Sequence, residues 1–210
     1  MATSQKPLIF LDWDGTLSDQ MLWHSFKEGS PKERYLGEEI KMKMFEGQDL
    51  YLSAWKRGEI TSESFVHDVS ELVGEEERVL WYRFVDDCKT MGFADLGYLD
   101  AIEELRRHAR VVLATDTGEH FRRFVVPEQQ LDRVFDDVLI SAERGCFKKE
   151  PELFFETYLD EIQNHRALIV DDTEAVCRAF MDLGGEAIEV GKEVSTHRAL
   201  SDALKWAKAV

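Results

Sequence analysis

Two aspartates separated by one residue follow the first apolar run of the chain. Leu8–Leu11 is typical of a buried strand, and Asp12 and Asp14 come directly after it, before Gly15 and Thr16 turn the chain. Neighbouring carboxylates are costly to bury unless a cation compensates their charge, and Mg²⁺ or Ca²⁺ prefers such hard oxygen ligands. The spacing therefore predicts a metal site at the carboxyl end of a strand. The alternative is that both aspartates cap a turn, since Asp-Gly is a common turn sequence.

Polar side chains also follow the later apolar runs, which are predicted strands at 111–114, 137–140 and 167–170. In chain order these side chains are Thr115 and Asp116, Lys148 and Lys149, and Asp171 and Asp172. A parallel sheet brings the carboxyl ends of its strands to one edge, so we expect these groups to converge there. A metal, an ammonium and a hydroxyl at one point are what a phosphoryl group needs, because catalysis of its transfer is positioning and charge neutralisation.

The elements that must position these groups form two kinds of segment. From residue 98 onward, strand and helix patterns alternate, which indicates an α/β fold with a Rossmann-like, three-layer parallel sheet. Residues 18–91 show helical periodicity and no convincing strand, with helices expected near 50–55, 61–72 and 79–85. We therefore expect an α/β core at 1–17 and 92–210, and an all-helical insertion at 18–91 with a modest core of its own.

Composition excludes several classes of function. The formal net charge of −16 repels nucleic acid and anionic lipid, so we expect neither as a partner. No apolar run is long enough to span a bilayer, and residues 1–7 lack the apolar core of a signal peptide. The three widely spaced cysteines fit neither a disulfide framework nor a zinc site. These features predict a soluble, cytoplasmic protein.

Four short motifs make the chain resemble the haloacid dehalogenase superfamily of phosphohydrolases over nearly its whole length. The motifs are Asp12-Trp13-Asp14-Gly15-Thr16, Val111-Val112-Leu113-Ala114-Thr115, Lys148-Lys149-Glu150-Pro151-Glu152-Leu153-Phe154 and Leu168-Ile169-Val170-Asp171-Asp172. The resemblance implies that family's Rossmann-like core, and it implies that the helical insertion is a C1 cap, which closes over the core and contacts the substrate. It also implies a magnesium-dependent phosphoric monoester hydrolase.

The resemblance assigns a role to each motif residue. Asp12 would be the nucleophile that forms an aspartyl-phosphate, and Asp14 would be the general acid and base. Dehalogenases of the superfamily typically lack this second acid, so Asp14 favours phosphate-ester hydrolysis. Thr115 would bind a phosphoryl oxygen, and Lys148 would neutralise the phosphate and hold Asp12. Lys149 is the competing lysine, and the alignment of Pro151 with the motif favours Lys148.

Magnesium would be bound by the Asp12 side chain, the Asp14 carbonyl and Asp171, with Asp172 as a further ligand through water or as an orienting partner. The backbone amides of Gly15 and Thr16 are expected to face the phosphate.

Two positions depart from the family's motifs. Asp116 stands where the family commonly has Asn beside the phosphate, and it could turn away, meet a cation or shape specificity. Lys149 stands where the family usually has Pro after the motif lysine.

Residues of the cap carry weaker expectations. Gln20 and His24 follow the first motif and could line the cleft. The three cap tryptophans, Trp23, Trp55 and Trp81, are expected to pack in the core. The turn at Lys56-Arg57-Gly58 could bring positive charge over the substrate, but a solvated loop is the default expectation.

The expected substrate is a small phosphorylated metabolite, and the protein is expected to be a monomer or a homodimer. Two alternatives stay open: a phosphonatase or phosphomutase on the same scaffold, and a phosphate-binding or regulatory protein without turnover. A phosphonatase needs a Schiff-base lysine in the cap, which leaves the candidates Lys27, Lys32, Lys41, Lys43 and Lys56.

Overall fold

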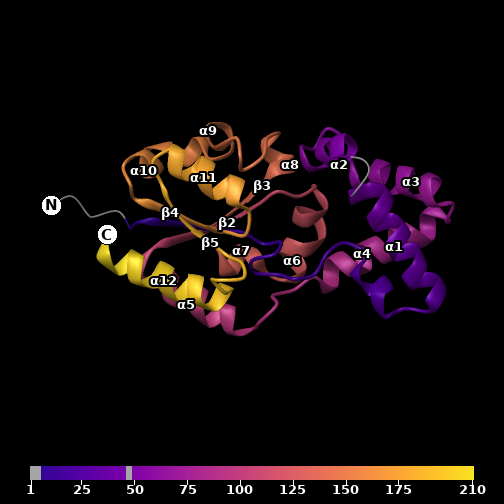
Figure 1. The fold of residues 1–210 in the computed structure, drawn as a ribbon, viewed down its shortest axis with the longest axis horizontal. Coiled ribbons are helices and arrows are strands. Elements are labelled where there is room, and N and C mark those ends of the chain that lie inside the picture. Colours follow the sequence, from indigo (N-terminus) through magenta and orange to yellow (C-terminus); the bar gives the residue numbers. More distant parts are fainter. Residues whose placement is uncertain (1–5, 46–48) are drawn as a thin grey trace.

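The computed structural model describes residues 6–45 and 49–210, and its centre is a sheet of five parallel strands (Figure 1). The strand order is β3-β2-β1-β4-β5. The strands are β1 (Leu8–Leu11), β2 (Arg110–Thr115), β3 (Asp137–Ile140), β4 (Ala167–Asp171) and β5 (Glu186–Glu189). The predicted α/β class is confirmed. Because β1 lies between β2 and β4, the residues that follow these three strands emerge side by side.

Helices cover both faces of the sheet because its strands alternate apolar side chains between two cores. Ile9 and Leu11 pack on one side, with α5 (Gly97–His108) and α12 (Thr196–Ala209). Leu8 and Phe10 pack on the other side, with α9 (Pro151–Phe154) and α11 (Glu174–Asp182). The remaining helices of this part are α6 (Val126–Glu128), α7 (Leu131–Val134), α8 (Ser141–Arg144) and α10 (Leu159–Gln163).

Two predicted helices are interrupted in the structure. The sequence pattern of 151–162 predicts one helix, but the structure divides this segment into α9, a 3₁₀ turn at Glu156–Tyr158 and α10. This break lets Phe155 and Tyr158 both pack on Phe10, with ring centroids 4.6 and 5.4 Å away. The sequence pattern of 117–125 also predicts a helix, but Thr117 and Gly118 are not helical, and a π-helical turn at Phe121–Val125 leads directly into α6.

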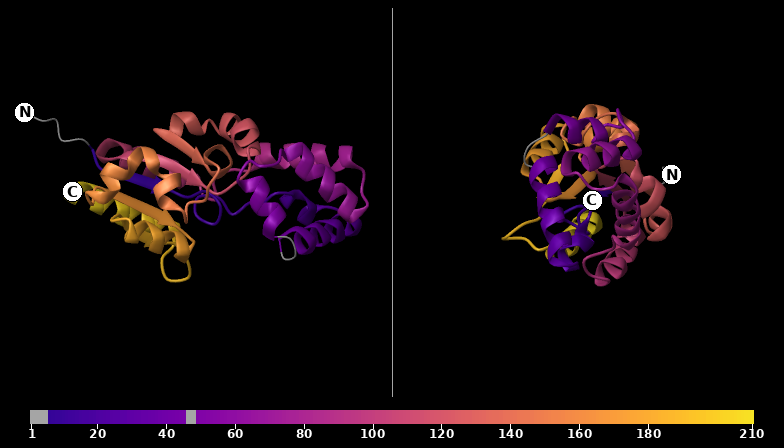
Figure 2. Two further views of the ribbon diagram at one scale, coloured as in Figure 1. Left: turned by 90° about the horizontal axis from the view of Figure 1, so that it is seen from above. Right: turned by 90° about the vertical axis from the view of Figure 1, so that its right-hand side faces the viewer.

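A helical insertion lies between β1 and β2 and forms one end of the elongated molecule (Figures 1 and 2). It contains a 3₁₀ helix (His24–Glu28) and the helices α1 (Pro31–Phe45), α2 (Asp49–Lys56), α3 (Ser62–Val73) and α4 (Glu77–Thr90). Its two connections to the sheet run together, and the Ala94 N–H donates to the Leu17 carbonyl at 2.9 Å. The domain limits at residues 17 and 92 stay a prediction.

The insertion does not have the separate core that the sequence suggested. Its buried side chains, among them Trp23, Trp55 and Phe65, belong to the same apolar cluster as Ile9 and Leu11 of the sheet. Aromatic contacts make this junction, since Trp55 and Phe84 of the insertion lie against the His120 ring with centroids 4.7 and 5.3 Å apart. Local periodicity could not reveal this continuity because these side chains meet only in three dimensions.

Among the described residues, no helix combines the length and apolar character that crossing a bilayer requires. Cys88, Cys146 and Cys177 are buried free thiols.

Candidate active site

Lys148 joins the ends of two neighbouring strands. Its ammonium Nζ lies 2.5 Å from Asp12 Oδ1, after β1, and 2.6 Å from Asp171 Oδ2, at the end of β4. All three side chains are buried. Lys149, the competing lysine, is exposed and lies over the Phe147 ring, 5.5 Å from its centroid.

Electrostatics at this centre depend on burial and on crowded charge. Burial opposes the charged form of Lys148, but Asp12 and Asp171 outweigh this effect and raise the pKa of its ammonium. Loss of solvation raises the pKa of Asp12 despite the attraction of Lys148. The lysine therefore stays protonated, and one ammonium does not offset all the carboxylates gathered here.

Three of these carboxylates can hold a divalent cation. Asp12, Asp171 and Asp172 each present an oxygen, and the three oxygens lie within 4.8 Å of one another. Gly15 makes room for this arrangement, because a Cβ at its position would lie 2.1 Å from Asp172 Oδ2. Its φ of +77° also favours glycine. The hard-oxygen donor set and the excess negative charge fit Mg²⁺.

Other polar groups surround the same point. The Thr115 hydroxyl, at the end of β2, is buried and has no hydrogen-bond partner within the described structure. Asp116 turns toward the lysine loop, where its Oδ1 accepts a hydrogen bond from the Lys148 backbone N–H at 3.0 Å. Asp14 is exposed to the cleft, yet loss of solvation around its carboxyl raises its pKa. An unpaired hydroxyl beside a buried ammonium provides donors for an oxyanion such as phosphate.

These groups line a cleft of about 460 Å³ between the sheet and the helical insertion. Its lining includes Asp12, Asp14, Leu52, Ser53, Lys56, Thr115, Asp116, Phe147, Lys148, Lys149 and Asp172. The places of Leu52 and Ser53 in this lining could not be predicted from the sequence, because nothing in a short amphipathic helix indicates which residues face a distant strand end.

The amides of Gly15 and Thr16 differ from the expectation that they face a phosphate. The Gly15 N–H donates to the Ser18 carbonyl at 2.8 Å, and the Thr16 N–H donates to the Trp13 carbonyl at 3.3 Å. Both amides are used by the turn that follows the first motif. A tight turn needs its own donors, so its amides are not free for a ligand.

The turn at Lys56-Arg57-Gly58 is docked on the core, which corrects the default expectation of a solvated loop. The Ser141 hydroxyl donates to the Lys56 carbonyl at 2.7 Å, and Arg57 pairs with Glu150 at 2.6 Å. Gly58 lies so close to the α8 backbone that a Cβ there would be 2.3 Å from the Ala142 oxygen. This docking holds Lys56 at the wall of the cleft.

Gln20 and His24, the two cap residues expected to line the cleft, lie in different cavities in the structure. Gln20 lines a second cavity beside the cleft, and its Oε1 accepts a hydrogen bond from the Gly92 N–H at 2.8 Å. His24 lies elsewhere, in a cavity between its own 3₁₀ turn and α1. Its ring Nδ1 is 3.1 Å from the Met21 carbonyl, which holds the ring away from the cleft. The expectation that His24 lines the cleft is wrong.

The expected packing of the cap tryptophans agrees with the structure. Trp23 and Trp55 are buried in the shared core, and Trp81 is partly buried against it.

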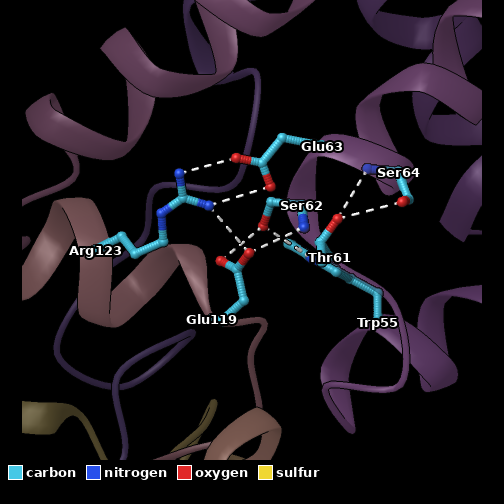
Figure 3. A network of polar contacts seen from close by, with 7 residues as sticks. All are labelled: Trp55, Thr61, Ser62, Glu63, Ser64, Glu119 and Arg123. Atoms are coloured by element: carbon cyan, nitrogen blue, oxygen red, sulfur yellow. Dashed lines mark hydrogen bonds and ion pairs between the residues drawn. The ribbon is translucent and has the colours of Figure 1, made fainter.

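A polar network joins the insertion to the segment after β2 (Figure 3). Glu119 accepts hydrogen bonds from the Ser62 N–H and hydroxyl, each at 3.0 Å, at the start of α3. Arg123 pairs with Glu63 at 2.9 Å and with Glu119 at 3.2 Å. Trp55 Nε1 donates to the Ser62 hydroxyl at 3.1 Å, so the network also fixes an indole that faces the core.

Known structures share this architecture. A HAD family enzyme from Bacteroides thetaiotaomicron superposes with a TM-score of 0.69 at 19% identity, over 90% of this chain and 95% of that chain. A predicted HAD-like family hydrolase from Porphyromonas gingivalis gives 0.70 at 21% identity, over 96% and 99%. The L-2-haloacid dehalogenase from Xanthobacter autotrophicus gives 0.65 at 14% identity, over 96% and 83%. These likenesses show that the chain has the haloacid dehalogenase-like fold.

Sequence comparison adds no closer relative. No protein-family model matches the chain, and no curated protein matches it.

Proposed function

We propose that this chain, with its haloacid dehalogenase-like fold, is a magnesium-dependent phosphatase that hydrolyses a small phosphomonoester through an aspartyl-phosphate. The observation that carries the proposal is the contact of Lys148 with both Asp12 and Asp171, beside the unpaired hydroxyl of Thr115. The buried Lys148 ammonium, and the buried Thr115 hydroxyl at the end of β2, are donors suited to the oxygens of a transferred phosphoryl group. We further propose that the enzyme is cytoplasmic, that it is a monomer or a homodimer, and that it acts on a phosphorylated metabolite.

In the first step, a carboxylate oxygen of Asp12 attacks phosphorus as the bond from phosphorus to the ester oxygen breaks. The electron pair of that bond goes to the leaving oxygen, which takes a proton from Asp14. Lys148 holds Asp12 in place and offsets the negative charge of the phosphoryl oxygens, and the Thr115 hydroxyl donates to one of them.

In the second step, a water molecule attacks the phosphorus of the aspartyl-phosphate and gives a proton to Asp14. The bond from phosphorus to the Asp12 oxygen breaks, which restores the carboxylate and releases inorganic phosphate. Asp12, Asp171 and Asp172 would hold Mg²⁺, which supplies positive charge where the phosphoryl group binds.

Two of the similar structures bear on the choice of reaction. The Bacteroides thetaiotaomicron enzyme has been crystallised in complex with magnesium and inorganic phosphate. The Xanthobacter autotrophicus structure has chloropropionic acid covalently bound, which fits dehalogenation. A leaving halide needs no proton, so the carboxyl of Asp14 in the cleft supports ester hydrolysis for this chain.

The test is phosphate release from an aryl phosphate with Mg²⁺ and with EDTA. We expect release that EDTA abolishes and that Asp12→Asn and Asp14→Asn each reduce at least a hundredfold. Asp132→Asn is the matched control, because this aspartate is exposed on α7. Full activity in either active-site variant would refute the assigned role.

Phosphonate hydrolysis remains the second candidate, because Lys56 is the cap lysine that lines the cleft among the described residues. Borohydride reduction in the presence of an aldehyde phosphonate would label Lys56 if it forms a Schiff base. The phosphatase proposal predicts no such label. It also predicts that Lys56→Gln hydrolyses phosphate esters at a rate within about tenfold of the parent.

A further inference from the structure

We propose that the second cavity receives the alcohol portion of the phosphomonoester, and that this alcohol is uncharged and mainly apolar with one further polar group. The inference rests on the proposed function, and it names the class of substrate. The cavity has a volume of about 460 Å³, which is within the usual range for a small-molecule site.

The position of the cavity relates it to the reacting atoms. Asp14, Lys56 and Asp172 line both the cleft and the second cavity, so the two spaces share a wall. The proposed acid must reach the ester oxygen that leaves. A phosphoryl group bound at Asp12 therefore places the rest of the ester on the side of Asp14 that opens into the second cavity.

Apolar side chains form much of the remaining wall. Met21 and Leu22 come from the connection that enters the insertion, and Met91 comes from the connection that leaves it. Trp55 adds a buried indole, on which the rings of Phe65 and His120 stack with centroids 4.2 and 4.7 Å away. Such a wall stabilises a hydrocarbon group by removing it from water.

His120 provides one polar group in this apolar wall. It is 1% exposed, and its ring Nδ1 has no hydrogen-bond partner within the described structure. Loss of solvation, with the charges of Lys56 and Arg123, lowers the pKa of His120 to about 3. The neutral ring can form a hydrogen bond with a hydroxyl or carbonyl of the ligand, but it offers no positive charge to an anion.

Charge at the rim also disfavours an anionic alcohol. Asp14, Asp19 and Asp172 border the cavity, and Lys56 is the cation among its lining residues. Lys56 already acts on Asp14 and Asp116 electrostatically. Lys56 is therefore already engaged by carboxylates of the cleft, and Asp19, which has no role in the proposed reaction, would repel a second carboxylate or phosphate on the substrate.

The experiment compares kcat/KM for three esters of equal chain length: butyl phosphate, its hydroxyl-terminated analogue and its carboxylate-terminated analogue. We expect both uncharged esters to exceed the carboxylate ester at least tenfold. Equal or greater activity on the carboxylate ester, with the activity still dependent on Asp12, would overturn this inference and leave the proposed function standing. Failure to hydrolyse any phosphomonoester would overturn both.

Two variants test the wall directly. Met21→Lys should raise the ratio of the carboxylate ester to butyl phosphate at least tenfold, whereas Leu153→Lys should leave it unchanged. Both parent side chains are partly exposed, at 49% and 61%, but only Met21 lines the cavity. His120→Phe keeps a ring beside Trp55 and should reduce the ratio of the hydroxyl-terminated ester to butyl phosphate about fivefold. Unchanged ratios in Met21→Lys and His120→Phe would overturn the inference.

Discussion

Replacing Lys148 by methionine removes the buried ammonium that contacts Asp12 and Asp171 at 2.5 and 2.6 Å. Breaking a buried ion pair by removing one partner costs about 3–5 kcal/mol, because the remaining charge is left uncompensated. Protonation of a remaining carboxylate sets an upper limit on this loss, because neutralising an ordinary aspartate at pH 7 costs about 4 kcal/mol. We therefore expect the free energy of unfolding of Lys148→Met to fall by about 3 kcal/mol in EDTA.

Urea unfolding at pH 7 measures this loss, with Lys149→Met as the matched control. Lys149 is exposed, so its replacement should change the free energy of unfolding by less than about 0.5 kcal/mol. Saturating Mg²⁺ should restore about 2–3 kcal/mol to Lys148→Met, because a ligand that binds only the folded state stabilises it. Equal stability of the two variants in EDTA would refute the electrostatic account of this centre.

Three further predictions concern the junction between the insertion and the core. Because the pKa of His120 is lowered to about 3, the unfolded chain binds more protons between about pH 3 and 6.5, and stability falls on acidification. Between pH 6.5 and 4.5, the free energy of unfolding of His120→Phe in urea should therefore fall by about 2–3 kcal/mol less than that of the parent; parallel pH profiles would contradict this. Gly118→Ala places a Cβ 2.3 Å from the Trp55 indole and should destabilise by about 1–3 kcal/mol in urea, whereas Gly92→Ala, with no contact under 3.5 Å, should have little effect; equal losses would exclude the clash. Glu119→Ala removes the acceptor at the start of α3 and should lower the melting temperature, at a cost of about 1 kcal/mol; an unchanged melting temperature would show that the network contributes nothing.

The sheet and the edge that carries the candidate site could be predicted because both depend on local sequence. Apolar runs such as 8–11 and 167–170 become buried strands, and a parallel sheet then fixes where the next residue lies. Asp12 follows β1 and Asp171 is the last residue of the neighbouring strand β4, so their proximity results from the strand order. Lys148 was harder to predict because it lies on a loop. The spacing to Pro151 identified the lysine that the structure places at Asp12.

Contacts between the insertion and the core could not be predicted, because they depend on how two surfaces meet. Nothing near Gly58 in the sequence indicates that its backbone will lie against Ala142. Similarly, His120 shows no ligand spacing, and its place in the second cavity follows from packing against Trp55. The wrong expectation for His24 has a local origin instead, since this residue begins a short 3₁₀ turn and its ring Nδ1 lies 3.1 Å from the Met21 carbonyl.

Trapping the covalent intermediate tests the central claim most directly. The protein is mixed with a phosphomonoester and Mg²⁺, quenched in acid within the time expected for the first turnover, and digested for peptide mass mapping. We expect a phosphoryl group on Asp12, absent in EDTA and in Asp12→Asn. Phosphate release with no phosphorylated Asp12, or with the group on another residue, would contradict the account.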